Sequence, residues 1–199
     1  MCQWIESIAL NNGVLKNLHY HQRRLNTTLS AFGSTVAISL DVLLNGCALP
    51  QVGYFKVRLL YSIQGVEELS WSKYTPHVWG EFYIVHTDDL SYNYKSSDRF
   101  RLEQLKEGLG DVEVIIIKEG LVTDTTYSNL VFHRLGEWFT PSNPLLNGTQ
   151  RDYLLEHGKI KEVSISVEDL TSYDSFKMIN AMMPFEEAIT YDICQIKNL

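Results

Sequence analysis

Cysteine and positive charge are both scarce in this sequence. Its three cysteines, Cys2, Cys47 and Cys194, lie far apart and form no CxxC pair. The pattern therefore predicts neither a disulfide scaffold nor a zinc site, and free thiols in a reducing compartment are the simpler interpretation. Lysine and arginine total 17 against 24 acidic residues, for a net charge of -7. Because nucleic acids are bound by clustered Lys and Arg, we expect no nucleic-acid partner.

Long apolar runs are missing as well. The longest, such as Val114–Ile117, have the length of a strand, and no basic segment followed by an apolar core opens the sequence. We therefore expect neither a membrane span nor a secretory leader, and a cytoplasmic location. The histidine spacing indicates no metal site. With 45% hydrophobic residues among 199, the chain can bury a core as one domain or as two small ones.

Apolar periodicity divides the sequence into two α+β halves. A strand at residues 4–10 and an Asn-Gly turn precede a helix between residues 17 and 33. A short helix near residues 41–49 follows. The next three apolar segments predict an antiparallel meander, with strands at 54–62, 67–73 and 81–86. We predict a first domain over residues 1–87, a linker over 88–94 and a second domain over 95–199.

The second half is predicted to form a barrel-like antiparallel sheet. Its helix at residues 98–107 precedes an almost wholly apolar strand at 112–118, a pattern typical of burial on both faces. Two further strands are predicted at 129–135 and 138–141. A last helix is predicted at 150–157, with Thr149 as its N-cap and Asp152 completing a capping box. The start of that helix offers backbone N–H groups and a positive dipole end, which suit a phosphate.

One lysine and one aspartate are candidates for imine chemistry. Lys95 lies at a predicted junction between strand and helix, and Asp124 follows one strand later, in a segment rich in Gly, Thr and Ser. A lysine amine can form an imine with an aldehyde, and a carboxylate can hold a pyridinium nitrogen, as pyridoxal-phosphate enzymes require. Each residue also has a simpler interpretation. Lys95 can be a solvated lysine, and Asp124 can merely stabilise its own turn.

Six short motifs in a fixed order carry a family resemblance. They are His21-x-x-Arg24-Leu25, Lys95-x-x-x-Arg99, Leu121-Val122-Thr123-Asp124 with Ser128-Asn129, Thr140-Pro141, Leu146-x-Gly148-Thr149-x-Arg151 and Asn180-Ala181-Met182-Met183-Pro184. Each motif alone is weak, but together they span nearly the whole chain. In this order they resemble the class IV, or fold-type IV, pyridoxal-phosphate enzymes, which include branched-chain and D-amino-acid aminotransferases and aminodeoxychorismate lyase. The resemblance implies two small α/β domains and a homodimer.

The resemblance assigns roles to individual residues. Lys95 matches the Schiff-base lysine, whose amine moves a proton between the substrate and pyridoxal 5'-phosphate (PLP). Asp124 stands where the family usually has a longer glutamate that keeps the pyridine nitrogen protonated. Arg24 matches the arginine of the phosphate site, and His21 is expected to be packed and hydrogen-bonded. The remaining cofactor contacts fall on Ser128, Asn129, Thr149, Asn180 and Ala181.

Substrate and reaction stay open at this stage. Arg58 is a candidate for binding a substrate carboxylate or for facing solvent, and Tyr92 and Tyr127 either line a pocket or simply pack. The Asn180–Pro184 segment is more similar to aminodeoxychorismate lyases than to branched-chain aminotransferases. The expected substrate is thus aminodeoxychorismate or an amino acid that transfers its amino group to a 2-oxo acid. Because the chain is short and Asp124 replaces Glu, a non-catalytic or regulatory PLP-binding paralogue is the alternative.

Overall fold

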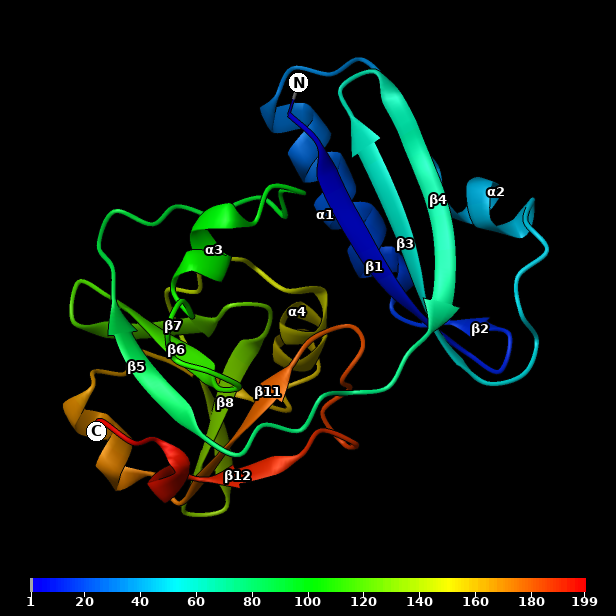
Figure 1. Ribbon diagram of the computed structural model, residues 1–199. Helices are drawn as coiled ribbons and strands as arrows, with labels where there is room; N and C mark the ends of the chain where they lie inside the picture. Colours follow the sequence, from blue (N-terminus) through cyan, green and yellow to red (C-terminus); the bar gives the residue numbers. More distant parts are fainter. Residues whose placement is uncertain (1) are drawn as a thin grey trace. The chain divides into compact units, whose positions relative to one another are not determined.

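The computed structural model describes residues 2–199, which form two compact units (Figure 1). The first unit contains the chain up to Pro76 together with Tyr94–Asp98, and the second contains His77–Asn93 and Arg99–Leu199. This division differs from the boundary expected at residues 88–94, because Lys95 belongs to the first unit. Backbone pairing is the reason, since the N–H of Ile5 donates to the carbonyl of Lys95 at 2.9 Å.

A four-stranded antiparallel sheet and two helices build the first unit (Figure 1). The strands lie in the order β2 (Val14–Leu15), β1 (Trp4–Asn11), β3 (Tyr54–Ser62) and β4 (Gly65–Lys73). Helix α1 (Leu18–Ala31) contributes Leu25 and Leu29 to a core that also takes alternate residues of β1 and β3. This is the period-2 burial of a sheet with one covered face.

Local signals explain the turns of this unit. Asn12 and Gly13 have φ values of 47° and 78° and join β1 to β2, as expected for a two-residue hairpin loop. Helix α2 (Leu40–Asn45) begins where the Ser39 side chain accepts from the Val42 N–H at 3.3 Å. It is shorter than the predicted 41–49 helix and ends at Asn45, with Gly46 as its C-cap.

The second unit contains an eight-stranded mixed sheet (Figure 1). Its main order is β10 (Lys161–Val163), β9 (Glu137–Pro141), β8 (Asn129–Arg134), β7 (Leu121–Thr125), β6 (Glu113–Lys118) and β5 (Phe82–His86). Strand β11 (Ser175–Ile179) pairs with β8 and with β12 (Thr190–Asp192). The helical elements are α3 (Phe100–Gln104), α4 (Thr149–Glu156) and the 3₁₀ turns Glu168–Ser172 and Ile193–Gln195.

Two expectations about these elements are wrong. Strand β5 does not extend the first meander but pairs in parallel with β6, because its buried Phe82 packs on Phe176 and Tyr191 in the second core. The sheet is therefore not wholly antiparallel. Helix α4 has Gly148 as its N-cap, without a side-chain cap hydrogen bond, so the capping box predicted from Thr149 and Asp152 does not form.

Burial of β6 on both faces is confirmed. Val114 and Ile116 pack in a cluster with Leu102, whereas Ile115 and Ile117 pack in the larger core on the other face. Alternate residues of a strand point to opposite faces, so this strand separates two apolar layers. Strand β6 pairs with β7, the strand that carries Asp124.

Candidate active site

A buried carboxylate organises the polar residues of the first unit. Glu6 lies at an inward position of β1 and is fully buried. It accepts from Arg24 Nε at 2.9 Å through Oε1, and from Arg24 Nη2 at 2.5 Å through Oε2. The same Oε2 lies 2.6 Å from His21 Nδ1. Residues three apart share one face of a helix, so α1 presents both side chains to Glu6.

The charges of this cluster are set by burial and pairing. Burial alone would raise the pKa of Glu6, but the Arg24 charge and the hydrogen bonds from His21 and Arg24 outweigh it and lower that pKa to about 2. Burial lowers the pKa of His21, against the opposing effect of Glu6 and with support from the charges of Arg24 and Lys95. His21 is therefore a neutral ring that donates its Nδ1–H, which confirms the packed, hydrogen-bonded histidine.

Lys95 runs alongside β1 in this unit. Its carbonyl accepts from Ile5, and Ser97 donates its N–H to the carbonyl of Gln3 at 2.9 Å. A bridge between Trp4 and Ser96 completes the pairing. The Lys95 side chain is half-buried, and its charge acts on His21. The first unit thus places a lysine in the electrostatic neighbourhood of the Glu6, His21 and Arg24 cluster.

In the second unit, Asp124 is held by donors on both carboxylate oxygens. Asn129 Nδ2 donates to Oδ1 at 2.8 Å, and the Leu146 N–H donates to Oδ2 at 2.9 Å. Asn129 Nδ2 also donates to the Leu146 carbonyl at 2.8 Å. Asp124 is 4% exposed, and burial raises its pKa to about 6 against these hydrogen bonds and the charge of Arg151. The carboxylate is mostly ionised at pH 7.

The turn after Asp124 connects to the Asn180 motif. Asn180 Nδ2 donates to Ser128 Oγ at 2.8 Å. Asn180 also closes its own turn, because its Oδ1 accepts from the Met182 N–H at 2.8 Å and its carbonyl from the Met183 N–H at 3.1 Å. Ala181 lies inside this turn. Two motifs separated by about fifty residues therefore meet through one side-chain hydrogen bond.

The start of α4 adjoins the same group. A Cβ on Gly148 would lie 1.9 Å from Asn129 Oδ1, so only glycine fits there beside Asn129. Thr149 and Gln150 follow as buried residues of the first helical turn. Backbone N–H groups at a helix start favour an anion. The second unit therefore places a helix N-terminus next to Asn129, which in turn holds Asp124.

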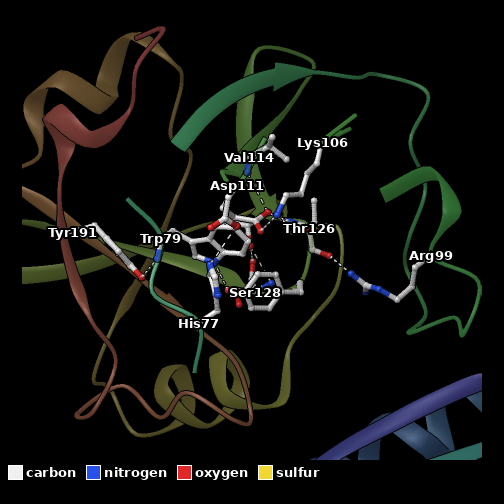
Figure 2. A network of polar contacts seen from close by, with 12 residues as sticks. His77, Trp79, Arg99, Lys106, Asp111, Val114, Thr126, Ser128 and Tyr191 are labelled. Carbon is white, nitrogen blue, oxygen red and sulfur yellow. Dashed lines mark hydrogen bonds and ion pairs between the residues drawn. The ribbon is translucent and has the colours of Figure 1, made fainter. Parts of the chain in front are cut away.

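A further polar network fixes the turn between β7 and β8 (Figure 2). Glu113 is fully buried, and its Oε1 accepts from both the N–H and the hydroxyl of Thr126, at 3.1 and 2.7 Å. Lys106 Nζ lies 3.1 Å from Glu113 Oε2 and 3.8 Å from the centre of the Trp79 ring. On the other side, Arg99 Nη2 donates to the Thr126 carbonyl at 2.9 Å. Two side chains, Glu113 and Arg99, thus hold three polar groups of Thr126.

Of the three candidate substrate residues, Arg58 and Tyr92 lie outside these groups, whereas Tyr127 lies in the turn between β7 and β8. Arg58 is opposite Ser7 in the β1–β3 register, so its side chain points to the face opposite Glu6, and it lies 3.8 Å from Glu68. Tyr92 packs against the cluster that contains Leu102. Tyr127 accepts a hydrogen bond from Trp79 Nε1 at 2.6 Å through its hydroxyl.

Sequence reasoning missed two central acids, although each left a signal. Glu6 occupies an inward position between Trp4 and Ile8 in the alternating pattern of β1, and Glu113 is the one acid in the apolar segment 112–117. An acid at a core position requires a buried partner. Among residues 2–199, no three His, Cys, Asp or Glu side chains are grouped to hold a metal ion. No helix in that range is long and apolar enough to cross a membrane.

Comparison with known proteins identifies the family. Residues 90–186 match the family described as "Amino-transferase class IV". The chain is 35% identical over 182 residues to an uncharacterized protein of Haemophilus influenzae, covering 89% of this chain and 96% of that protein. It therefore spans nearly the full length of this relative.

Solved structures give the same result. A crystal structure described as a "putative 4-amino-4-deoxychorismate lyase" from Haemophilus somnus is 33% identical, with a TM-score of 0.83 over 92% of this chain and 97% of that one. An aminotransferase from Brucella abortus, bound to the cofactor PLP, has the same fold at 19% identity, with a TM-score of 0.72 over 95% of this chain and 80% of that one. The chain belongs to the class IV aminotransferase family and is an enzyme of that family.

Proposed function

We propose that this enzyme binds PLP covalently through Lys95 and releases pyruvate from 4-amino-4-deoxychorismate to give 4-aminobenzoate. The observation that carries the cofactor assignment is Asp124, a buried carboxylate with a donor on each oxygen and a pKa of only about 6. Such a group stays anionic at neutral pH, as a partner of a pyridinium nitrogen must. The choice of reaction is supported by the Haemophilus somnus relative.

The residues present fit a phosphorylated pyridine cofactor. The side chain of Asn129 occupies the position that a Cβ on Gly148 would take, so the backbone at the start of a helix of eight residues is bare of side chain there, and its N–H groups suit a phosphate. Arg24, whose Nε and Nη2 are held by Glu6, supplies a fixed positive charge for an anion. The buried Glu6 offsets its charge and holds its orientation.

Each residue then has a defined task. PLP, when bound, supplies an electron sink for the carbon next to the substrate nitrogen. Asp124 keeps the ring nitrogen protonated, and its short side chain is held by Asn129 and Leu146. The amine of Lys95 holds the cofactor at rest and carries a proton during turnover. Ser128, Asn180, Ala181 and Thr149 orient the cofactor, and the enzyme acts as a homodimer.

Transamination is the second candidate, because the matching family is described by that activity. Both reactions need the same lysine and the same buried acid, so these residues cannot distinguish them. The products do distinguish them. Release of 4-aminobenzoate requires no amino acceptor, whereas transamination converts a 2-oxo acid into an amino acid with each turnover.

The test is a paired assay of the purified protein loaded with PLP. We expect 4-aminobenzoate from 4-amino-4-deoxychorismate, and a long-wavelength absorbance band that substrate changes. Lys95→Ala should lose both, whereas Lys73→Ala, an exposed lysine of β4 in the same unit, should keep both. Turnover of a 2-oxo acid without 4-aminobenzoate would establish the transaminase instead. A band that no substrate changes would refute both reactions in favour of a cofactor-binding protein without turnover.

A further inference from the structure

Arg151 is a motif residue to which neither the resemblance nor the proposed function gives a role. It is the third residue of α4 and is 3% exposed. Its Nη1 donates to Asn147 Oδ1 at 3.0 Å, its Nη2 donates to the Pro141 carbonyl at 2.8 Å, and Nη2 also contacts Glu162 Oε1. Within residues 2–199, its Nε has no hydrogen-bond partner. A buried guanidinium destabilises the folded state unless it is paired. The position of these contacts therefore indicates what the buried residue holds in place.

The contacts of Arg151 fasten both ends of one segment. Pro141 is the last residue of β9, and Asn147 directly precedes the N-cap of α4. Between these two anchors lies Leu146, whose N–H donates to Asp124 and whose carbonyl accepts from Asn129. The segment 141–148 therefore clamps the Asp124 carboxylate through its backbone, and Arg151 holds the clamp at each end.

The charge of Arg151 adds to the effect of these hydrogen bonds on Asp124. The positive charge of Arg151 lowers the pKa of Asp124, against the burial that raises it. The other groups acting on Asp124 are the backbone N–H groups of Leu146 and Leu145 and the amide of Asn129. Glu162, the counter-ion of Arg151, is 46% exposed, so water screens much of its negative charge and the guanidinium keeps a net effect on its surroundings.

We propose that Arg151 is a positioning residue for Asp124: its buried guanidinium anchors both ends of the 141–148 segment, whose backbone clamps the carboxylate. The catalytic meaning of this role rests on the proposed function, since an ionised Asp124 matters there as the partner of the cofactor nitrogen. The clamp and the charge themselves are properties of the protein without cofactor. They can therefore be tested without any activity.

The test is a carboxyl-carbon NMR titration of Asp124 in the cofactor-free protein, together with hydrogen exchange of the Leu146 amide. We expect a wild-type midpoint near 6, a higher midpoint in Arg151→Gln and an intermediate one in Arg151→Lys, which keeps the charge without the fork. Leu146 should exchange faster in both variants. Arg134→Gln, which removes an arginine over the rings of Phe139 and Tyr173, should match the wild type.

A fourth variant covers the possibility that Arg151→Gln does not fold. Glu162→Gln removes a half-exposed negative charge next to the guanidinium, and it should lower the Asp124 midpoint, opposite to the effect of Arg151→Gln. Titration of Asp124 at the wild-type midpoint in Arg151→Lys and Glu162→Gln, with unchanged Leu146 exchange, would overturn the proposal. Such a failure would leave covalent binding of PLP at Lys95 unaffected, so the two proposals fail separately.

Discussion

Replacing Glu6 by glutamine tests the charge arrangement that holds Arg24. The wild-type pKa of about 2 lies about 2.5 below the ordinary 4.5, which corresponds to about 3 kcal/mol of stability from the ionised carboxylate. Glutamine has the same shape but only one acceptor oxygen, so Arg24, which donates to both oxygens of Glu6, cannot keep both of its hydrogen bonds. We therefore expect the free energy of unfolding at pH 7 to fall by about 3 kcal/mol.

The pH dependence of that loss has a defined sign. A carboxyl group whose pKa is lower in the folded than in the unfolded state stabilises the fold above the unfolded value, here about 4.5. This contribution is lost as the pH falls through the folded value of about 2. The difference between wild type and Glu6→Gln should thus be largest at neutral pH. At pH 3 it should be roughly 2 kcal/mol smaller.

Urea titrations at pH 7 and pH 3, followed by circular dichroism, measure this difference. The matched control is Glu68→Gln on β4. Glu68 is 55% exposed, and its Oε2 lies 3.8 Å from Nη1 of Arg58, so this pair is exposed and loosely held. An exposed pair of this kind contributes about 0 to 1 kcal/mol, so the control should unfold like the wild type. Equal stability of Glu6→Gln and wild type at pH 7, or a difference that persists in full at pH 3, would refute the reasoning.

Substitutions at three further positions address the second unit. Asp124 has a folded pKa of about 6 against an ordinary 3.8. The wild type should therefore lose about 3 kcal/mol of stability as the pH rises from about 4 through 6, and Asp124→Asn should lack that loss in urea titrations of the cofactor-free protein. Glu113→Ala removes the acceptor of both Thr126 donors and leaves Lys106 without its carboxylate. Thermal unfolding should therefore show that the free energy of unfolding falls by about 3 kcal/mol, and Glu113→Gln should restore roughly half of this loss. Equal melting temperatures of the two variants would contradict this. In Gly148→Ala the new Cβ must displace the Asn129 side chain. This should lower the free energy of unfolding by about 1 to 3 kcal/mol and broaden the Asn129 amide signals in NMR spectra. Unchanged signals would show that Asn129 does not contact residue 148.

Much of the fold was predictable because it rests on local periodicity. The predicted strand at 54–62 coincides with β3, and the apolar segment at 112–118 became the doubly buried β6. The sheet to which a strand belongs is not a local property. Strand β5 joined β6 through packing of Phe82 on aromatic residues about a hundred positions away, and no pattern within residues 81–86 encodes that choice.

Contacts between distant residues of the candidate site could not be predicted from the sequence either. The motifs indicated Arg24 and Asp124, and they contain Asn129 and Leu146, but they did not show that these two residues hold Asp124. Glu6 approaches Arg24 from 18 residues away, and the donor on Asp124 Oδ2 is the backbone N–H of Leu146. Every residue except proline carries such an N–H, so it leaves no mark in the sequence. The alternating pattern of β1 identifies a buried acid at position 6 but does not reveal which cation it meets.

Covalent binding of PLP at Lys95 is the central claim, and reduction with borohydride followed by peptide mass spectrometry tests it most directly. Borohydride fixes a cofactor held as an imine, so the account predicts one modified peptide, carrying the pyridoxyl group on Lys95. Lys95→Ala should yield no modified peptide under the same conditions. A pyridoxyl group on another lysine of the wild type, or a bound cofactor that borohydride leaves unattached, would contradict the account.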